Sequence, residues 1–154
     1  MTDLYNKLAR IFYRLAYKVI QLWFFVARPT ISGVYVAVWY EGRLLVIKNS
    51  YKKSFTIPCG RIKRGEAIAQ AAVRELNEEV GIKLDPGQLT FVGRYNGQFK
   101  WARDEGSFFE IEMNQMPQIE PDNREVVWAR FMSLEQIRKL PLNATVKNWL
   151  DSRS

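Results

Sequence analysis

The chain has 154 residues, which fits one domain of ordinary size with a short extension and excludes two large domains. Its residues are 47% hydrophobic and 25% charged, the balance of a folded protein rather than a disordered one. The sequence contains no histidine and one cysteine, Cys59. Mechanisms that need an imidazole, an internal disulfide or a cysteine cluster for zinc are therefore excluded, and any bound metal must be held by oxygen.

The net charge of +7 is distributed unevenly along the chain. Residues 1–28 carry five basic residues and one acidic residue, residues 29–64 carry seven and one, and residues 65–154 carry eleven and fourteen. A basic front half joined to an acidic back half predicts a partner whose anionic groups meet the first part and whose cationic group meets the second. A polyphosphate with a divalent cation would meet both conditions.

Residues 1–28 are predicted to form a basic amphipathic helix that precedes a domain at 29–154. Apolar residues recur at steps of three or four between residues 4 and 26, and Pro29 ends the pattern. No apolar run approaches the roughly 20 residues of a membrane span, and no signal-peptide cleavage site follows. Three interpretations remain open: a helix packed on the domain, a contact between two copies in a homodimer, and a helix that lies on an anionic membrane surface.

After Pro29 the pattern changes to that of strands separated by turns. Strands are predicted at residues 31–40, 43–48, 54–57, 89–95, 107–113 and 126–131. Helices are predicted at residues 66–80, with Gly81 as a left-handed cap, and at 133–140 and 143–150. Strands that flank a central helix, with helices at the ends, indicate an α/β fold with a mixed sheet between helical layers.

The helix predicted at residues 66–80 carries three carboxylates on one face. Glu75, Glu78 and Glu79 fall within an arc of about 100° at roughly 3.6 residues per turn. Such a cluster disfavours the helix unless positive charge lies against it, and Mg²⁺ or Mn²⁺ would supply that charge at carboxylate oxygens. From these three residues alone, a solvated acidic face is the simpler interpretation.

The sequence around these carboxylates resembles the Nudix box, Gly-x5-Glu-x7-Arg-Glu-U-x-Glu-Glu-x-Gly-U, in which U is aliphatic. Every specified position from Gly60 to Ile82 matches this pattern. The strands predicted before and after the box extend the resemblance over about residues 31–150. The resemblance implies a Nudix-type α/β/α sandwich with a mixed sheet, and hydrolysis of a nucleoside diphosphate linked to another moiety.

The resemblance also implies a role for each residue of the box. Glu78 and Glu79 would bind the divalent metal, and Glu75 would bind metal or take the proton from the attacking water. Arg74 would orient these glutamates and balance their charge, and Glu66 would support the loop and the metal shell. A metal activates water and neutralises phosphate oxygens, so this chemistry needs no histidine.

One residue departs from the common form of the family, because Cys59 stands where many members have glycine. The family often uses the backbone carbonyl at this position as a metal ligand. That carbonyl survives the substitution, whereas the freedom of glycine at positive φ does not. A more specific interpretation is that Cys59 acts as a thiolate nucleophile, but the chain has no histidine to activate the thiol.

Further candidates lie outside the box. Several Nudix groups place an additional catalytic or metal-binding glutamate in a late loop, and Glu125 stands at such a place, although an ordinary acidic loop is an equal alternative. Basic residues that could meet substrate phosphates are Arg43, Lys48, Lys52, Lys53, Arg61, Lys63 and Arg64. Aromatic residues that could stack on a base are Tyr51, Phe55, Tyr95, Phe99 and Trp101. We expect Arg43, Lys48, Lys53, Arg61 and Trp101 to bind substrate, although a solvated surface charge is the simpler interpretation of each basic residue taken singly.

The leading hypothesis is a cytoplasmic, metal-dependent hydrolase of a small nucleoside diphosphate derivative, such as a nucleotide sugar, ADP-ribose or a nucleoside triphosphate. One alternative is removal of pyrophosphate from the 5′ end of RNA, which the basic front half suggests. Another, from a different class, is a catalytically inactive nucleotide-sensing module held at the inner face of a membrane by the N-terminal helix.

Overall fold

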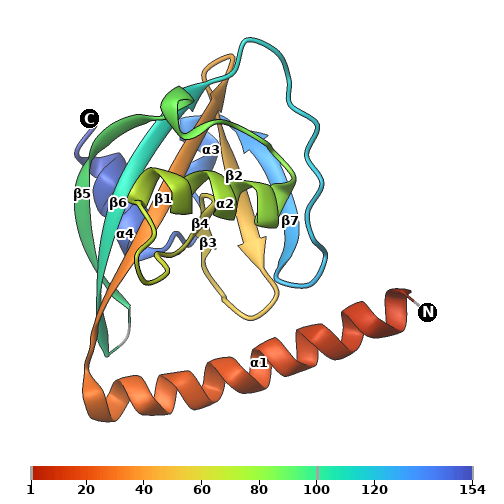
Figure 1. Ribbon diagram of the computed structural model, residues 1–154, viewed down its shortest axis with the longest axis vertical. Coiled ribbons are helices and arrows are strands. Elements are labelled where there is room, and N and C mark those ends of the chain that lie inside the picture. The colour runs from red at the N-terminus through yellow and green to blue at the C-terminus, as the bar shows by residue number, and fades with distance from the viewer. Residues whose placement is uncertain (1, 100, 154) are drawn as a thin grey trace.

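The chain forms a long N-terminal helix, then the strands of a mixed sheet with one α-helix between them, and two short α-helices toward the C-terminal end (Figure 1). The computed structural model describes residues 2–99 and 101–153, without the side chains of Thr2 and Phe99. The candidate stacking side chain of Phe99 thus lies outside the described part. The elements are α1 (Thr2–Ala27), β1 (Thr30–Tyr40), β2 (Arg43–Asn49), β3 (Phe55–Thr56), β4 (Cys59–Arg61), α2 (Ile68–Val80), the 3-10 turn η1 (Pro86–Gln88), β5 (Thr90–Phe99), β6 (Ala102–Glu112), β7 (Val126–Met132), α3 (Leu134–Ile137) and α4 (Ala144–Asp151).

The sheet is mixed, as the sequence predicts. Strand β1 runs parallel to β6, from Thr30 opposite Arg103 to Trp39 opposite Glu112, while β5 and β6 form an antiparallel hairpin. Strand β2 pairs antiparallel with β1 near their shared turn and with β7 along its length. Farther from the turn, β4 pairs with β1, and this pairing brings the first residues of the Nudix box beside the centre of the sheet.

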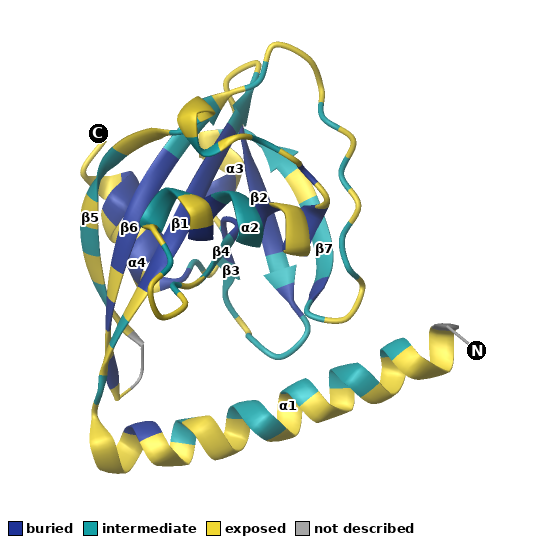
Figure 2. Ribbon diagram, in the orientation of Figure 1, coloured by how far each residue is buried: buried dark blue, intermediate teal, exposed yellow. Residues whose placement is uncertain are grey.

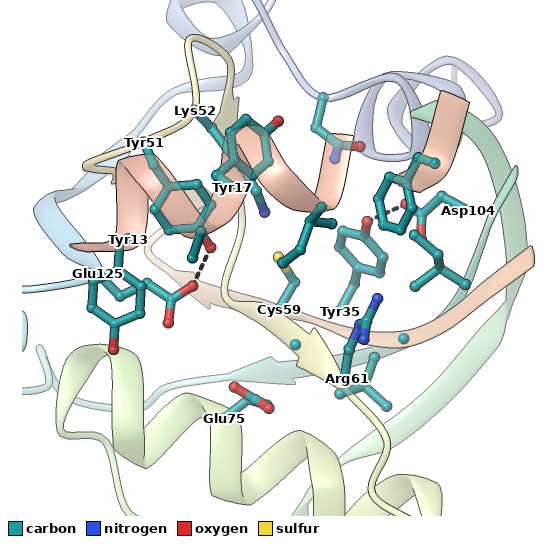
Figure 3. A pocket seen from close by; sticks show the side chains of 18 residues that line it. Tyr13, Tyr17, Tyr35, Tyr51, Lys52, Cys59, Arg61, Glu75, Asp104 and Glu125 are labelled. Carbon is teal, nitrogen blue, oxygen red and sulfur yellow. Dashed lines mark hydrogen bonds between the residues drawn. The ribbon is translucent and has the colours of Figure 1, made fainter. Parts of the chain in front are cut away.

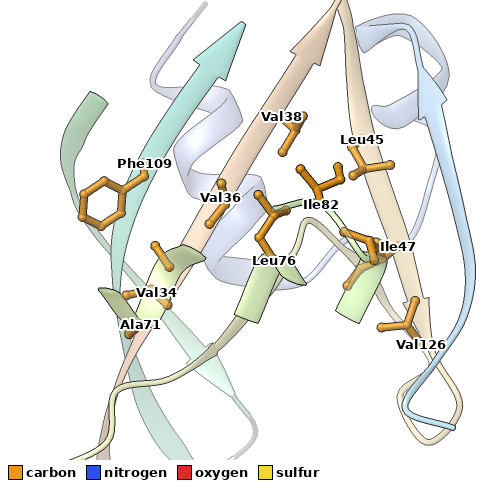
Figure 4. Close-up of a cluster of buried hydrophobic side chains, with 12 residues drawn as sticks. Val34, Val36, Val38, Leu45, Ile47, Ala71, Leu76, Ile82, Phe109 and Val126 are labelled. Carbon is orange, nitrogen blue, oxygen red and sulfur yellow. The ribbon is translucent and has the colours of Figure 1, made fainter. Parts of the chain in front are cut away.

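Alternation along β1 sends side chains into two separate cores. Val34, Val36 and Val38 face α2 and pack with its apolar side, which includes Leu76 and Val80 (Figure 4). Tyr35 and Ala37 point to the opposite face, where α3 and α4 cover the sheet. The α/β/α sandwich is therefore confirmed, with α2 as one outer layer and α3 with α4 as the other.

The helix caps form where the sequence places them. Gly81 adopts a left-handed conformation with φ 75°, and its N–H donates to the carbonyl of Asn77. Ser133 and Gln136 form a reciprocal capping box at α3. The side chain of Asn143 accepts from the first N–H groups of α4.

Several boundaries differ from the sequence prediction, and β4 forms at residues 59–61, where no strand was predicted. Helix α2 begins at Ile68, because the residues before it form a turn in which the N–H of Glu66 donates to Lys63. Strands β5 and β6 extend to the tip of their hairpin, since the polar residues that favour a loop at 96–106 still pair in register. Helix α3 ends at Ile137 rather than at residue 140.

Helix α1 lies beside the sandwich and runs along one end of the sheet (Figure 1). Its Phe24 is buried, and Arg10 and Arg14 donate through Nε to the carbonyls of Asn123 and Ser50. Within the described residues, no helix combines the length and the apolar character that crossing a membrane requires.

Candidate active site

The centre of the candidate site is the contact between α2 and β4, where Glu75 lies against Gly60. A Cβ atom built on Gly60 would lie 1.9 Å from the Glu75 carboxyl carbon. Gly60 has a negative φ, so the glycine is needed here for space and not for conformation. The first position of the Nudix box thus makes room for one of its carboxylates.

Arg74 connects the glutamates of the box. Its Nε and Nη2 donate to the two carboxylate oxygens of Glu66 at 2.7 and 2.9 Å, and its Nη1 donates to Glu75 at 2.6 Å and to Glu78 at 3.2 Å. Nη2 also donates to the carbonyl of Arg61 at 2.9 Å. This fork ties the loop before α2 to the carboxylates on the helix.

The Arg74 contacts affect the two carboxylates differently. Hydrogen bonds from Arg74 and from the Lys63 backbone lower the pKa of Glu66 to about 2. Burial raises the pKa of Glu75, although Arg74 opposes that shift. Glu66 is therefore a fixed anion, whereas Glu75 is a carboxylate whose environment makes it a better proton acceptor.

Glu79 is the most deeply buried carboxylate of the box, with 4% of its surface exposed. Its Oε2 accepts from the backbone N–H of Cys59 at 2.9 Å. Burial raises the pKa of Glu79 well above its ordinary value, the Cys59 N–H opposes the shift, and the charge of Glu125 adds to it. A buried carboxylate beside another carboxylate favours a cation as its partner.

Glu125 joins the site from the loop before β7. It accepts a hydrogen bond from the hydroxyl of Tyr51, and its charge acts on both Glu75 and Glu79 (Figure 3). Lys52 reaches the same region. Burial lowers the pKa of Lys52, but the negative charges of Glu79 and Glu125 outweigh that effect and raise it. The late-loop glutamate therefore lies with the carboxylates of the box.

A cavity of about 420 Å³ opens beside these carboxylates and is lined mainly by apolar and aromatic side chains. One wall is built by α1, through Tyr13, Tyr17 and Phe24 among others. The ring of Tyr51 lies 6.0 Å from that of Tyr13 and 5.1 Å from that of Tyr17. The N-terminal helix is therefore part of the site, although it lies outside the Nudix box.

The cavity has a second polar end, away from Glu125 (Figure 3). Buried Asp104 on β6 accepts hydrogen bonds from the hydroxyls of Tyr35 and Thr145. The ring of Tyr35 also stacks on that of Phe108, with 4.6 Å between the ring centroids. A group that binds here would meet a carboxylate and a phenol held in fixed positions.

The predicted substrate-binding residues are only partly brought together. Arg61 lines the cavity. Lys52 lines it too, although it is not among the residues expected from the sequence to bind substrate. Lys48 instead donates to the Lys53 carbonyl, and its Nζ lies 4.5 Å from the Phe55 ring centroid.

Arg43, Lys53 and Trp101 lie outside the cavity lining described by the structure. Arg43 begins β2 at the turn with β1, and Lys53 is exposed. Trp101 lies at the tip of the β5–β6 hairpin, where its ring contacts Phe25 of α1 at 5.1 Å. These three side chains therefore lie at separate places on the domain and do not meet at the cavity.

The aromatic wall from α1 and the Asp104 end were not among the sequence predictions. Tyr13 and Tyr17 are four residues apart and lie on a helix face different from the apolar stripe. This spacing is the one sequence signal that they line the cavity together. Asp104 gives no such signal, because its burial depends on Tyr35 and Thr145, both distant in sequence.

Cys59 keeps an ordinary backbone conformation with a negative φ, so its substitution for glycine causes no strain of that kind. Burial, followed by the charge of Glu79, raises the pKa of its thiol to about 12. The thiol is therefore protonated at neutral pH, which does not support a thiolate nucleophile.

The carboxylates supply suitable oxygen donors for a divalent cation, but in this structure their oxygens do not converge on one position. Among residues 2–99 and 101–153, no group of three Asp, Glu or Cys side chains is arranged to hold a metal ion. Glu78 and Glu75 turn toward Arg74, and Glu79 turns toward Cys59. Their hard oxygens and the mutual repulsion of Glu75, Glu79 and Glu125 fit Mg²⁺ or Mn²⁺.

Comparison with known proteins agrees with the fold and the box. The family model of the NUDIX domain matches residues 29–152, so the chain belongs to the Nudix family. A relative described as phosphatase NudJ, from Shigella boydii, is 31% identical over 105 residues, which cover 64% of this chain and 65% of that relative. The chain thus matches less than two thirds of the length of this relative.

Solved structures share the same fold. A MutT NUDIX hydrolase from Burkholderia pseudomallei matches with a TM-score of 0.71 and 18% identity, over 82% of this chain and 98% of that one. The NUDIX domain of Shewanella oneidensis NrtR, solved with ADP ribose, matches with a TM-score of 0.69 and 12% identity, over 80% and 86% of the two chains. At these identities the likeness concerns the fold.

Proposed function

We propose that this protein is a divalent-metal-dependent pyrophosphohydrolase that cleaves the diphosphate linkage of a small nucleoside diphosphate derivative. The observation that carries the proposal is that Glu75 and Glu125 line one cavity beside the Arg74 fork, while the charges of both act on buried Glu79 behind it. The relatives and neighbours named above support it, because they are described as a phosphatase, a hydrolase and an ADP-ribose complex.

Each residue of the site has a distinct task in this proposal. Glu79, with Glu78 and Glu125, would hold Mg²⁺ or Mn²⁺, joined by the carbonyl of Cys59. The bound metal supplies charge neutralisation at the phosphate oxygens and lowers the pKa of water. Glu75, whose own pKa is raised by burial, takes the proton from the attacking water.

The remaining residues position the reactants. Arg74 holds Glu75 through Nη1, and Glu66 holds Arg74 through two hydrogen bonds. Lys52 and Arg61 line the cavity and would balance the charge of the substrate phosphates. The organic part of the substrate would lie between the α1 tyrosines and the Asp104 end.

The shape of the site favours a small molecule over the 5′ end of RNA. A volume of about 420 Å³ is in the range of small-molecule pockets. Helix α1 covers one side of it, and Arg43, Lys48 and Lys53 do not form a continuous basic track toward it. An RNA substrate would gain most of its affinity from such a track.

A substrate panel tests the proposal. The full chain is incubated with nucleotide sugars, ADP-ribose, nucleoside triphosphates and a 5′-triphosphorylated RNA oligonucleotide, and released phosphate is measured after a coupling phosphatase. We expect turnover of at least one small derivative with Mg²⁺ or Mn²⁺, abolished by a chelator. Turnover of the RNA alone would favour the RNA alternative, and no turnover of any compound would favour an inactive nucleotide-sensing module.

A further inference from the structure

Helix α1 exposes a continuous apolar stripe. Among the described residues, twelve of the sixteen exposed large hydrophobic side chains belong to this one helix. They are Leu4, Tyr5, Leu8, Ile11, Phe12, Leu15, Val19, Ile20, Leu22, Trp23, Phe25 and Val26, of which Ile20 also lines the cavity and lies off the stripe. Figure 2 shows the exposed residues along the side of α1 that faces away from the sheet. This stripe is larger than the scattered apolar residues of an ordinary surface.

The contacts of α1 with its own domain use a different face of the helix. Phe24 is 3% exposed, Tyr13 stacks on Tyr51, and Arg10 donates to the carbonyl of Asn123. By contrast, Leu15 and Val19 are 58% and 68% exposed. Docking on the domain therefore leaves most of the apolar stripe exposed, although Phe25 contacts Trp101 and the Tyr5 ring lies near Arg124.

Positive charge borders the stripe. Helical spacing places Lys7, Arg14 and Lys18 along one edge of it, and all three are exposed. Asp3, which pairs with Lys7 at 2.9 Å, is the one acidic residue in the sequence of α1. An apolar stripe with a basic edge and little negative charge is typical of a helix that lies in the interface of an anionic bilayer.

Aromatic side chains continue the stripe beyond the end of the helix. Trp101, 49% exposed at the tip of the β5–β6 hairpin, contacts the ring of Phe25 at 5.1 Å. Exposed Trp23 lies on the same part of α1. Tryptophan prefers the boundary between headgroups and acyl chains, because its ring is apolar and its N–H is polar.

A second copy of the chain fits this face less well. If two α1 helices pack antiparallel about a two-fold axis, their apolar stripes meet and their basic edges fall on the same side, next to each other. Like charges placed in this way repel. A surface of anionic lipid instead neutralises Lys7 and Lys18 while it buries the apolar side chains.

We propose that α1 binds an anionic lipid bilayer through this stripe and holds the protein at the membrane surface. The stripe enters the boundary of the acyl chains, and the basic edge meets the lipid phosphates. Because Tyr13 and Tyr17 line the cavity from the opposite side of the same helix, the cavity lies about one helix diameter, roughly 10 Å, from the bilayer. The binding does not depend on the catalytic proposal, and it is measured without a substrate.

Vesicle co-sedimentation of the full chain tests this inference. We expect binding to vesicles of phosphatidylcholine mixed with phosphatidylglycerol, and binding at least about tenfold weaker to phosphatidylcholine alone. The double substitution Leu15→Glu and Val19→Glu is expected to weaken binding by at least about tenfold. Lys7→Gln and Lys18→Gln are each expected to weaken it by roughly fivefold.

Met116→Glu is the matched control, because Met116 is 55% exposed on a loop away from α1. It should bind vesicles like the unchanged chain, and far-UV circular dichroism with thermal unfolding checks that each variant is folded. In a second measurement, lipids with brominated chains should quench tryptophan fluorescence of the unchanged chain, and Trp23→Phe should reduce the quenching.

The inference is overturned if the unchanged chain remains in the supernatant with both kinds of vesicle. It is also overturned if the two α1 glutamates leave binding unchanged. A dimer that Leu15→Glu dissociates, seen by light scattering together with no vesicle binding, would assign the stripe to a second copy instead.

Discussion

At the scale of single residues, the site depends on how closely Gly60 and Glu75 approach each other. The absent side chain of Gly60 leaves the space that the Glu75 carboxylate fills, while Arg74 holds that carboxylate from the other side. The position of the proposed base, Glu75, therefore depends on Gly60, which has no reactive side chain.

Gly60→Ala should move the Glu75 carboxylate, because the new Cβ would lie 1.9 Å from its carboxyl carbon. A displacement of about 1 Å at a catalytic group costs on the order of a hundredfold in rate, so we expect kcat to fall at least that far. Gly87→Ala is the control, since a Cβ at Gly87 meets no atom within 4 Å. Equal kcat values for the two variants would show that Glu75 does not need this space.

Glu66→Gln should change how stability depends on pH. The folded-state pKa of Glu66 is about 2, below its ordinary value of 4.5, so its stabilising effect is present above pH 4.5 and is lost as the pH falls toward 2. The difference in Tm between the unchanged chain and the variant should be largest near neutral pH and shrink below pH 4.5.

Thermal unfolding across this pH range provides the check for Glu66. Glu135→Gln, which removes an exposed carboxylate paired with Lys139, is the control. A difference in Tm for Glu66→Gln that stays constant from neutral to acid pH would contradict a lowered pKa at this residue.

Residues of the Nudix box could be placed from the sequence, because their roles depend on spacing along one loop and one helix. The proximity of Glu125 to the box was an open prediction, and it depends on how β7 pairs with β2. Asp104 and Tyr35 could not be predicted, since they meet across parallel strands that lie far apart in the sequence.

At the scale of elements, α1 illustrates the limit of hydrophobic periodicity. The period predicts a helix, and the structure contains one from Thr2 to Ala27. The apolar stripe does not identify the face that docks, because Tyr13, Tyr17 and Phe24 make the contacts with the domain. The helix docks through a mixed face that lines the cavity, and not through its most apolar face.

Tyr17→Leu tests whether α1 contributes to substrate binding. Tyr17 lines the cavity, and its ring lies 5.1 Å from that of Tyr51. Loss of an aromatic contact of this kind is worth about 0.5–1.5 kcal/mol, so we expect KM to rise between about twofold and tenfold, with a smaller change in kcat.

The control for Tyr17 is Phe12→Leu, which removes an aromatic ring from the outward face of the same helix, where Phe12 is 68% exposed. With a soluble substrate and no vesicles, Phe12→Leu should leave KM unchanged. The same KM for both variants would mean that the α1 wall does not contact the substrate.

At the scale of the whole molecule, the sandwich gathers four distant segments around one cavity. Strand β4 brings Gly60, helix α2 brings Glu75, the loop before β7 brings Glu125, and α1 closes one side. Apart from β4, the order of strands and helices could be predicted from turns and caps. The closing position of α1 could not, because no local pattern specifies how a terminal helix packs.

We expect the buried carboxylate of Glu79 to support metal-dependent hydrolysis beside this cavity. The most direct measurement is the initial rate of phosphate release during a Mg²⁺ titration, with Glu79→Gln compared against Glu135→Gln. We predict a Mg²⁺-dependent rate for the unchanged chain and for Glu135→Gln, and a loss of at least about a hundredfold for Glu79→Gln. An unchanged Mg²⁺-dependent rate in Glu79→Gln would show that Glu79 does not support metal-dependent hydrolysis.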